Sequence, residues 1–176
     1  MIQIGKQLMY RDQVCTLVDI AKQYRNDTDY YVLQYRGDQP LTIRVPVDLA
    51  TKTMRPLITK KELKALVARI PHISAVELGK YTKGEEYKRL LASGDHEDVI
   101  KVIKTAYLRK QERLEKSHKP TESDKLYFRQ AEKRLYAEVA CVLDMSIQEA
   151  KEFIVQKVKD AEQSLVKDEE QPLATA

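Results

Sequence analysis

Three histidines, two cysteines and a few acidic pairs are the residues of this chain whose types are suited to catalysis or metal binding. His72, His96 and His118 are isolated, because none has a second histidine or cysteine three or four residues on. The pair Glu85-Glu86 lies on a predicted helix, where adjacent side chains do not face each other. Neither common glycine-rich phosphate-binding pattern occurs. These residues predict a binding protein rather than an enzyme, with no metal site and no cofactor.

The two cysteines, Cys15 and Cys141, lie in different halves of the chain among apolar residues. We interpret them as reduced thiols of the core in a cytoplasmic protein, not as a disulfide. Neither has a histidine nearby in sequence. Because a catalytic partner needs only to be near in space, this spacing counts only weakly against a nucleophilic role.

Aromatic residues alternate with cations near the middle of the chain, which is a pattern suited to nucleic acid. The residues concerned are Tyr81, Tyr87 and Tyr107 with Lys80, Lys83, Lys88 and Arg89. Aromatic rings can stack on bases or wedge between them, and cations bind the phosphate backbone. The alternative is that each tyrosine packs at the edge of the core. For Tyr107 we favour this alternative, because it lies on the apolar side of its predicted helix.

The net charge of the 176-residue chain is only +4, but the charge is unevenly distributed. Residues 80–134 carry 15 Lys and Arg against 10 Asp and Glu, whereas residues 135–176 carry 4 against 9. A basic middle beside an acidic end indicates one surface for a polyanion and another that repels it. Solvated outer faces of amphipathic helices would give charged surfaces too, so the charges leave both interpretations open.

These residues must be positioned by two kinds of structure, and the first is a small sheet. Apolar residues alternate over residues 2–58, which predicts short strands at 8–10, 14–24, 30–35 and 41–45. The turn residues Arg25-Asn26-Asp27-Thr28 and the segment Arg36–Pro40 separate them. A short helical turn is expected around Val47–Ala50. Short strands joined by tight turns predict a strongly bent sheet or an SH3-like barrel with an exposed edge.

The second kind of structure is helical, and its boundaries follow from capping residues. We expect helices over 60–70, 83–93 and 95–116, then one opened by Thr121 and one opened by Ser146. Gly94 supplies a left-handed C-cap and Asp95 an N-cap within two residues. Ser146 and Glu149 form a capping box. Residues 72–84, with two glycines and no clear period, are interpreted as a linker or hinge.

Helical spacing also predicts which side chains form the core of the second half. The apolar sides are Leu63, Leu66, Val67 and Ile70; Val99, Ile103, Ala106, Tyr107 and Leu114; Leu126, Tyr127, Ala131, Leu135, Val139 and Val142; and Ile147, Ala150, Ile154, Val158, Ala161 and Leu165. The fold class is therefore α+β, with a bent sheet followed by a helical bundle.

The two ends of the chain carry little further information. The start, MIQIGKQLMY, lacks the basic-then-apolar pattern of a secretory signal, and no apolar run approaches the ~20 residues that span a bilayer. We therefore expect a cytoplasmic protein without membrane contact. The end, from about Val166, is acidic and is predicted to be disordered.

Several ordered segments of the chain together resemble one family. They are QIGKQLMY, YYVLQY, LTIRVPVD, RPLITKKEL, YKRLLASGD, VIKVIKTAYLRKQE and DKLYFRQAEKRLYAEVA, over nearly all of residues 2–154. No single segment is diagnostic, but their order and spacing resemble those of the CarD/CdnL family of bacterial transcription regulators. The sheet half alone also resembles the polymerase-interaction module of the transcription-repair coupling factor.

This resemblance implies a domain organisation and two partners. Residues 1–58 would form a Tudor-like domain that binds the β subunit of RNA polymerase, and residues 59–79 a connecting helix and linker. Residues 80–166 would form a helical domain that contacts promoter DNA at the upstream edge of the bubble, followed by a disordered acidic tail at 167–176. Such a protein acts as a monomer, localises to the nucleoid through the polymerase, and stabilises the open complex by binding it better than the closed one.

The resemblance also implies roles for individual residues. Arg44 and Pro46 match the RVP motif of the polymerase-binding sheet, and Lys22 falls near a second basic position there. The expected DNA contacts are Lys80, Tyr81, Lys83, Lys88, Arg89, Lys125 and Arg129.

The chain departs from the family pattern at two places. The first turn reads Tyr10-Arg11-Asp12-Gln13-Val14 where the family often has Tyr-Pro-x-His-Gly. Many members wedge a Trp into the minor groove, but this chain has no Trp, and Tyr81 is the candidate in its place. These departures, with the acidic last helix, leave an alternative open. The protein would then be a polymerase-binding adaptor whose helical domain binds another protein rather than DNA.

Overall fold

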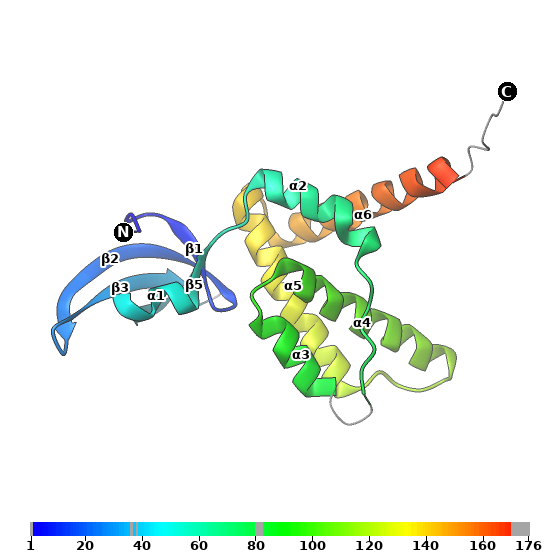
Figure 1. Cartoon of the computed structure of the whole chain (residues 1–176), viewed down its shortest axis with the longest axis horizontal. Coiled ribbons are helices and arrows are strands. Elements are labelled where there is room, and N and C mark those ends of the chain that lie inside the picture. The colour runs from blue at the N-terminus through cyan, green and yellow to red at the C-terminus, as the bar shows by residue number, and fades with distance from the viewer. Residues whose placement is uncertain (1, 36, 38, 80–82, 170–176) are drawn as a thin grey trace. The chain divides into compact units, whose positions relative to one another are not determined.

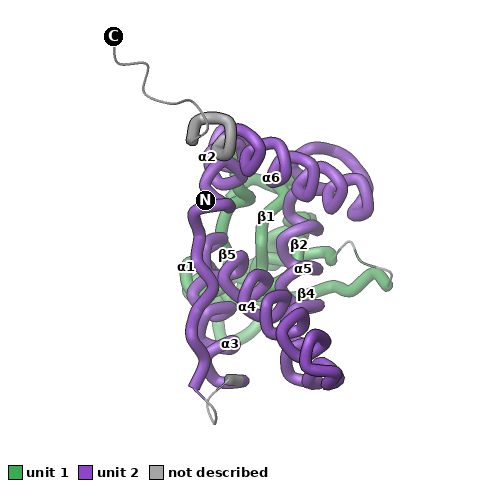
Figure 2. Tube along the Cα trace, turned by 90° about the vertical axis from the view of Figure 1, so that its right-hand side faces the viewer, with its two compact units in different colours: residues 1–59 green, residues 60–176 purple. Residues whose placement is uncertain are grey.

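The computed structural model of the chain describes residues 2–35, 37, 39–79 and 83–169, with the side chains of the last range given for residues 84–164 (Figure 1). The chain divides into two compact units, residues 1–59 and 60–176, which are coloured separately in Figure 2. The first unit carries a sheet and one short helix, and the second is built from helices. The α+β class predicted from the sequence is confirmed.

The first unit is an antiparallel sheet of five strands in the order β4-β3-β2-β1-β5. The strands are β1 Gln7–Tyr10, β2 Gln13–Arg25, β3 Thr28–Tyr35, β4 Leu41–Pro46 and β5 Met54–Pro56, and helix α1 spans Val47–Thr53 between the last two. Side chains alternate between the two faces of each strand. One face buries the core of the unit, in which Leu8, Cys15, Leu17, Tyr31, Leu33, Val45 and Ala50 form one cluster.

The sheet is open, and β4 and β5 are its two edges. The strands at 8–10, 14–24, 30–35 and 41–45 are present within one or two residues of their predicted ends. Strand β5 was not predicted, because a strand of three residues directly after a helix is too short to show alternation. It pairs with β1 through Leu8↔Pro56 and Tyr10↔Met54, so it extends the sheet on the side opposite β4.

The second unit contains five α-helices within its described residues, and they pack side by side (Figure 1). They are α2 Lys60–Arg69, α3 Lys83–Ala92, α4 His96–Glu115, α5 Glu122–Leu143 and α6 Ile147–Glu169, with a 3-10 turn η1 at Ile70–His72. Helix α5 lies centrally and contacts α2, α3, α4 and α6. In the described part of the chain, no helix is both long and apolar enough to cross a lipid bilayer.

The capping residues explain why these helices begin and end where they do. Gly94 has a φ of +79°, and the Asp95 side chain accepts a hydrogen bond from the Glu97 amide at 2.9 Å. The Ser146 hydroxyl accepts from the Glu149 amide at 3.1 Å, and the Glu149 carboxylate accepts from the Ser146 amide at 2.7 Å. This reciprocal pair confirms the predicted capping box.

Residues 70–76 are held against helix α4, although the sequence indicated a linker or hinge from residue 72. The Lys104 ammonium donates to the carbonyl oxygens of Ile70 and Ile73, the latter at 2.7 Å. The Val76 amide donates to the Thr105 hydroxyl at 3.0 Å. These bonds join the backbone of residues 70–76 to two side chains of α4, Lys104 and Thr105. Helix α2, expected to connect the domains, packs against α5 and α6 within the second unit.

Parts of the predicted helical core are exposed. Tyr107, Leu114, Leu126 and Ile147 each keep about half of their surface in solvent, whereas most of the other predicted core residues described are buried or half-buried. Tyr107, which we expected at the edge of the core, keeps half of its surface in solvent. Helical spacing shows which side of a helix is apolar, but it does not show how far along the helix neighbouring elements cover that side.

The predicted tail lies partly in regular structure. Helix α6 continues through residues 167–169, which the sequence assigned to a disordered segment. Residues 170–176 of that predicted tail lie outside the residues that the structure describes.

Candidate functional site

Arg44 and Pro46 lie on the edge strand β4, on the face of the sheet opposite the core. Their register partners on β3 are Val32, which is itself buried, and Tyr30, which is half-buried; both alternate with Tyr31 and Leu33 of the core cluster. Arg44 is exposed and Pro46 is half-buried at the end of the strand. The two residues of the predicted polymerase-binding motif are therefore presented together on an outward face beside an unpaired strand edge.

Two tyrosines hold Arg44 on this outer face. The guanidinium carbon of Arg44 lies 5.0 Å from the centroid of the Tyr24 ring, within the range of a cation–π contact. The Tyr24 ring in turn meets Tyr30 edge to face, with centroids 5.4 Å apart and planes at 65°. Tyr24 is 53% exposed. The Tyr24 ring therefore orients the Arg44 guanidinium, and Tyr30 supports the Tyr24 ring.

The sequence did not indicate Tyr24 or Tyr30 as site residues, because a β-bulge brings them together. The register between β2 and β3 shifts between Ala21↔Tyr30 and Arg25↔Thr28. Gln23 at the bulge, and Asn26 and Asp27 in the turn, all have positive φ. The Asn-Asp turn itself is readable from sequence, since a two-residue hairpin loop favours such residues. The two extra residues of the bulge cannot be predicted from the sequence in this way.

Lys22, the third predicted polymerase contact, lies at the same hairpin. Its ammonium forms an ion pair with Asp29 at 2.8 Å, and the Gln23 amide donates to the same carboxylate at 2.9 Å. These two hydrogen bonds, first that of Lys22 and then that of Gln23, hold the pKa of Asp29 below its usual range. The Lys22 side chain remains 67% exposed, so it can still reach a partner.

The predicted DNA contacts are divided between helices α3 and α5. Lys80 and Tyr81 lie outside the described residues, and Lys83 begins α3 with its side chain outside them. Lys88 and Arg89 are exposed on α3. The Arg89 guanidinium is engaged by Glu86 through two hydrogen bonds, of which that from Nε measures 3.1 Å.

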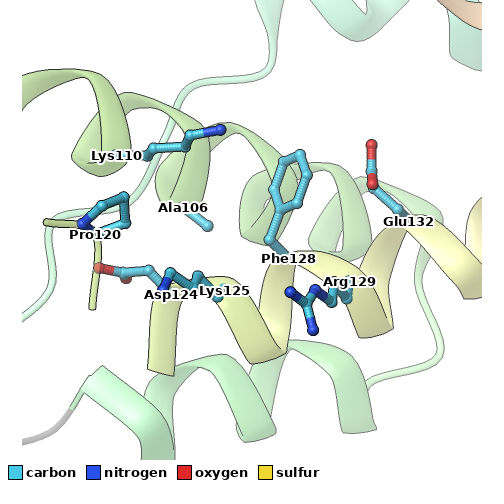
Figure 3. Close-up of a pocket in the computed structure, with 8 residues that line it drawn as sticks. All are labelled: Ala106, Lys110, Pro120, Asp124, Lys125, Phe128, Arg129 and Glu132. Carbon is cyan, nitrogen blue, oxygen red and sulfur yellow. The ribbon is translucent and has the colours of Figure 1, made fainter. Parts of the chain in front are cut away.

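Lys125 and Arg129 lie one turn apart on α5 and line a groove between α4 and α5 (Figure 3). The groove has a volume of about 350 Å³ and is lined by Ala106, Lys110, Pro120, Asp124, Lys125, Phe128, Arg129 and Glu132. Lys125 makes an ion pair with Glu122 at 2.7 Å. Lys110 and Phe128 were not predicted as site residues. Phe128 falls between two predicted cations in the sequence, and that spacing is the signal by which it could have been found.

The charge balance of this groove is positive. Within the described part of the chain, Lys110 and Arg129 make no ion pair. The Glu132 carboxylate has Lys151 at 3.6 Å and the Tyr136 hydroxyl at 3.5 Å. The Asp124 carboxylate is occupied by Arg109 at 3.0 Å. The two acids of the groove are therefore already compensated, and the free cationic groups can accept an anion.

The Asp124 carboxylate joins α4 and α5, which line the groove, to each other and to α3. It accepts hydrogen bonds from the Tyr87 hydroxyl at 2.8 Å on α3 and from the Thr121 hydroxyl at 2.6 Å at the start of α5. Arg109 reaches it from α4. Burial alone would raise the pKa of Asp124, but these three donors outweigh burial and lower it. Burial first, and then the Asp124 hydrogen bond, raise the pKa of the Tyr87 phenol.

Two of the residues whose types are suited to catalysis have structural surroundings. His96 lies 2.9 Å from the buried Glu138 carboxylate, so it joins α4 to α5. Burial raises the pKa of Cys15 to about 11, and the thiol is therefore protonated at neutral pH. Among the described residues, no group of three or more His, Cys, Asp or Glu is placed to hold a metal ion.

Comparison with known proteins adds no relative to this description. No protein-family model matches the chain, and no curated protein matches it.

Proposed function

We propose that this chain is a CarD-like transcription regulator. Its first unit, of Tudor-like type, binds the β subunit of RNA polymerase, and its second unit contacts promoter DNA at the upstream edge of the bubble. The protein acts as a monomer without a cofactor. It stabilises the open complex because it binds that state better than the closed one, which is how any ligand shifts a conformational equilibrium.

The observation that carries this proposal is the outer face beside edge strand β4. An unpaired strand edge offers backbone groups to an extended segment of a partner, which can add to the sheet. Arg44 stands beside that edge on Tyr24, so little side-chain entropy is lost when the guanidinium meets a partner carboxylate. An exposed cation beside a free strand edge can add charge recognition to the backbone hydrogen bonds of such a contact.

The groove of the second unit supports the DNA half of the proposal. Lys125, Arg129 and Lys110 are gathered on two adjacent helices, and the groove acids are compensated. Lys88 and Arg89 add positive charge on α3. Clustered cations of this kind neutralise phosphates and release counterions.

The polymerase half is tested by Arg44→Glu in the full chain. We expect binding to the β subunit to weaken about thirtyfold or more, because a reversed charge leaves a partner carboxylate repelled and unpaired. Unfolding stability should change by about 0–1 kcal/mol, since Arg44 is exposed. Arg25→Glu, an equally exposed change on β2, is the matched control. Unaltered affinity of a folded Arg44→Glu protein would exclude Arg44 from the interface.

The DNA half is tested at Tyr81, the predicted wedge, which lies outside the described residues. Tyr81→Ala should shorten the lifetime of the promoter open complex while polymerase binding is retained, because kinking a base step costs a few kcal/mol that wedge contacts repay. Tyr107→Ala, at a half-exposed tyrosine on α4, is the control. If Tyr81→Ala lowers only the melting temperature and leaves the lifetime unchanged, the residue packs against the protein and the wedge is excluded.

A second candidate function is that of a polymerase-bound adaptor whose helical unit binds a protein. The observation that favours it is the exposed apolar surface on α4, where Tyr107, Leu108 and Leu114 each expose about half of their area. The two candidates differ in salt dependence. Affinity for DNA falls steeply with salt, whereas an apolar protein contact is little affected.

A further inference from the structure

The groove between α4 and α5 combines an aromatic ring with unpaired cations. Phe128 rises from α5 into the groove between Lys110 and Glu132, and Arg129 and Lys125 flank its base (Figure 3). Phe128 is half-buried, so part of its ring remains available. Phe128 is one of only two phenylalanines in the chain.

We propose that this groove holds one unstacked base of a single nucleic-acid strand. Phe128 provides the stacking surface, and Lys110 and Arg129 bind the adjoining phosphates. Aromatic rings beside cations are the common way of binding single strands, because every base has a flat apolar face and every nucleotide carries a phosphate.

The dimensions of the groove favour this occupant. Its volume of about 350 Å³ lies at the lower end of the range for small-molecule pockets, which is appropriate for one nucleotide. A base inside a duplex is covered on both faces by its neighbours and has no face to offer to Phe128. The groove would therefore prefer a strand whose bases have been opened.

The charges favour a nucleic-acid strand over an apolar peptide. Lys110 and Arg129 are without ion pairs among the described residues, and Asp124 and Glu132 are held by Arg109 and Lys151. Desolvating two unpaired cations against an apolar helix would be unfavourable. Phosphates on either side of a stacked base would compensate the charges of both cations.

This inference rests on the proposed function and makes it more specific, because it assigns the second unit to a melted strand rather than to duplex alone. It also concerns a different residue from the predicted wedge at Tyr81. The two contacts can therefore be separated by mutation.

The test is the affinity of the full chain for a labelled oligothymidylate of about 12 nucleotides, measured by fluorescence anisotropy. We expect Phe128→Leu to weaken binding about tenfold, because it removes the stacking surface but keeps an apolar side chain. Phe128→Tyr keeps the ring and should retain affinity. Phe153→Leu, the same change at the other phenylalanine, on α6, is the matched control. Melting temperatures identify any variant that is unfolded.

The outcomes against the proposal are specific. Affinity of Phe128→Leu within about twofold of the wild type would overturn it, as would equal loss in Phe128→Leu and Phe128→Tyr. The proposal would also be overturned if a duplex of the same sequence, or polyglutamate, competed as well as the single strand. That result would mean that the groove binds polyanions through its charge alone.

The phosphate contacts are tested by salt dependence. Arg129→Gln and Lys110→Gln should each lower the slope of log affinity against log salt by about 0.7, the value for one single-strand phosphate. Lys159→Gln, an exposed lysine on α6, should leave the slope unchanged. Unaltered slopes in both groove variants would show that neither Lys110 nor Arg129 contacts a phosphate.

The binding assay contains no polymerase, so its failure is distinguishable from failure of the proposed function. A chain that binds the β subunit through Arg44 but shows no Phe128-dependent affinity for single strands would retain the function without this groove. A chain with Phe128-dependent affinity and no polymerase binding would retain the groove without the function.

Discussion

Asp124 shows how one buried charge organises three helices. Its carboxylate is 2% exposed and is bonded by side chains from α3, from α4 and from the start of α5. A buried carboxylate without such donors would be strongly unfavourable, so the donors and the acid require one another. The geometry of the groove above Asp124 depends on this arrangement.

The lowered pKa of Asp124 leads to a prediction on acid stability. A group whose pKa is lower when folded stabilises the protein above its unfolded pKa, and that stability is lost as the pH falls through the folded value. We expect Asp124→Asn to be less stable than the wild type by about 1–3 kcal/mol at neutral pH. The difference should narrow below about pH 4.

Urea unfolding of both proteins at neutral and at acid pH measures this difference. Tyr87→Phe, which removes one donor and keeps the carboxylate, serves as the comparison and should cost less than Asp124→Asn. A difference between wild type and Asp124→Asn that stays constant with pH would show that ionisation of Asp124 does not stabilise the fold.

Tyr24 should act on the polymerase interface through Arg44. Tyr24→Leu removes the ring on which the guanidinium rests, and we expect affinity for the β subunit to fall about threefold to tenfold, as for the loss of one partly exposed cation–π contact with its ordering. Stability should be little changed, because Tyr24 is 53% exposed. Tyr24→Phe keeps the ring and should retain affinity. Equal losses in the two variants would point to the hydroxyl instead of the ring.

At the scale of elements, the junction between α3 and α4 depends on the backbone of Gly94. Its φ of +79° is strained for any residue with a Cβ, although there is open space around it. Gly94→Ala should therefore lower the free energy of unfolding by about 1–2 kcal/mol, and Gly94→Asn by less. Thermal or urea unfolding measures both.

Gly84 offers a control of opposite sign. It lies in the first turn of α3, where a Cβ would meet only ordinary contacts at 3.9 Å. Gly84→Ala should leave stability unchanged or raise it by up to about 1 kcal/mol, because alanine loses less backbone entropy in a helix. Destabilisation by Gly84→Ala as large as that by Gly94→Ala would show that space, not φ, decides the effect at both glycines.

Helix boundaries were largely predictable because capping is local. Asp95, Thr121 and Ser146 each accept the expected amide hydrogen bond within three residues of themselves. Strand β5 and the hold of Lys104 on residues 70–73 were not predictable, since both depend on partners more than 30 residues away in sequence.

In the candidate site, too, local features were predictable and contacts between distant residues were not. Arg44 and Pro46 could be named from a short motif, and Lys125 and Arg129 from their sequence positions. Tyr24 became part of the site through a bulge, and Lys110 through the packing of α4 on α5. A single sequence carries residue types and local spacing, but not which side chains from separate elements will meet.

At the scale of the whole molecule, two compact units predict two separable activities. Arg44→Glu should weaken binding to the β subunit about thirtyfold or more and leave affinity for an oligonucleotide unchanged, whereas Arg129→Glu should weaken affinity for the oligonucleotide and leave binding to the β subunit unchanged. Both assays are made on the same protein preparations. Loss of both activities in either variant, with the fold intact by circular dichroism, would show that one surface serves both partners.

The short strand β5 also has a mechanical consequence. The backbone leaves the first unit at Thr59, three residues after β5, a strand that three register pairs join to β1 and that ends in Pro56, a residue without an amide hydrogen. Tension between a partner held by the sheet and one held by the helices must pass through this strand. Under load β5 would detach before β2 and β3, which are joined over more positions. Its three residues would then lengthen the connection between the two units by about 10 Å. The chain could therefore extend under load while each unit keeps its contacts with its own partner.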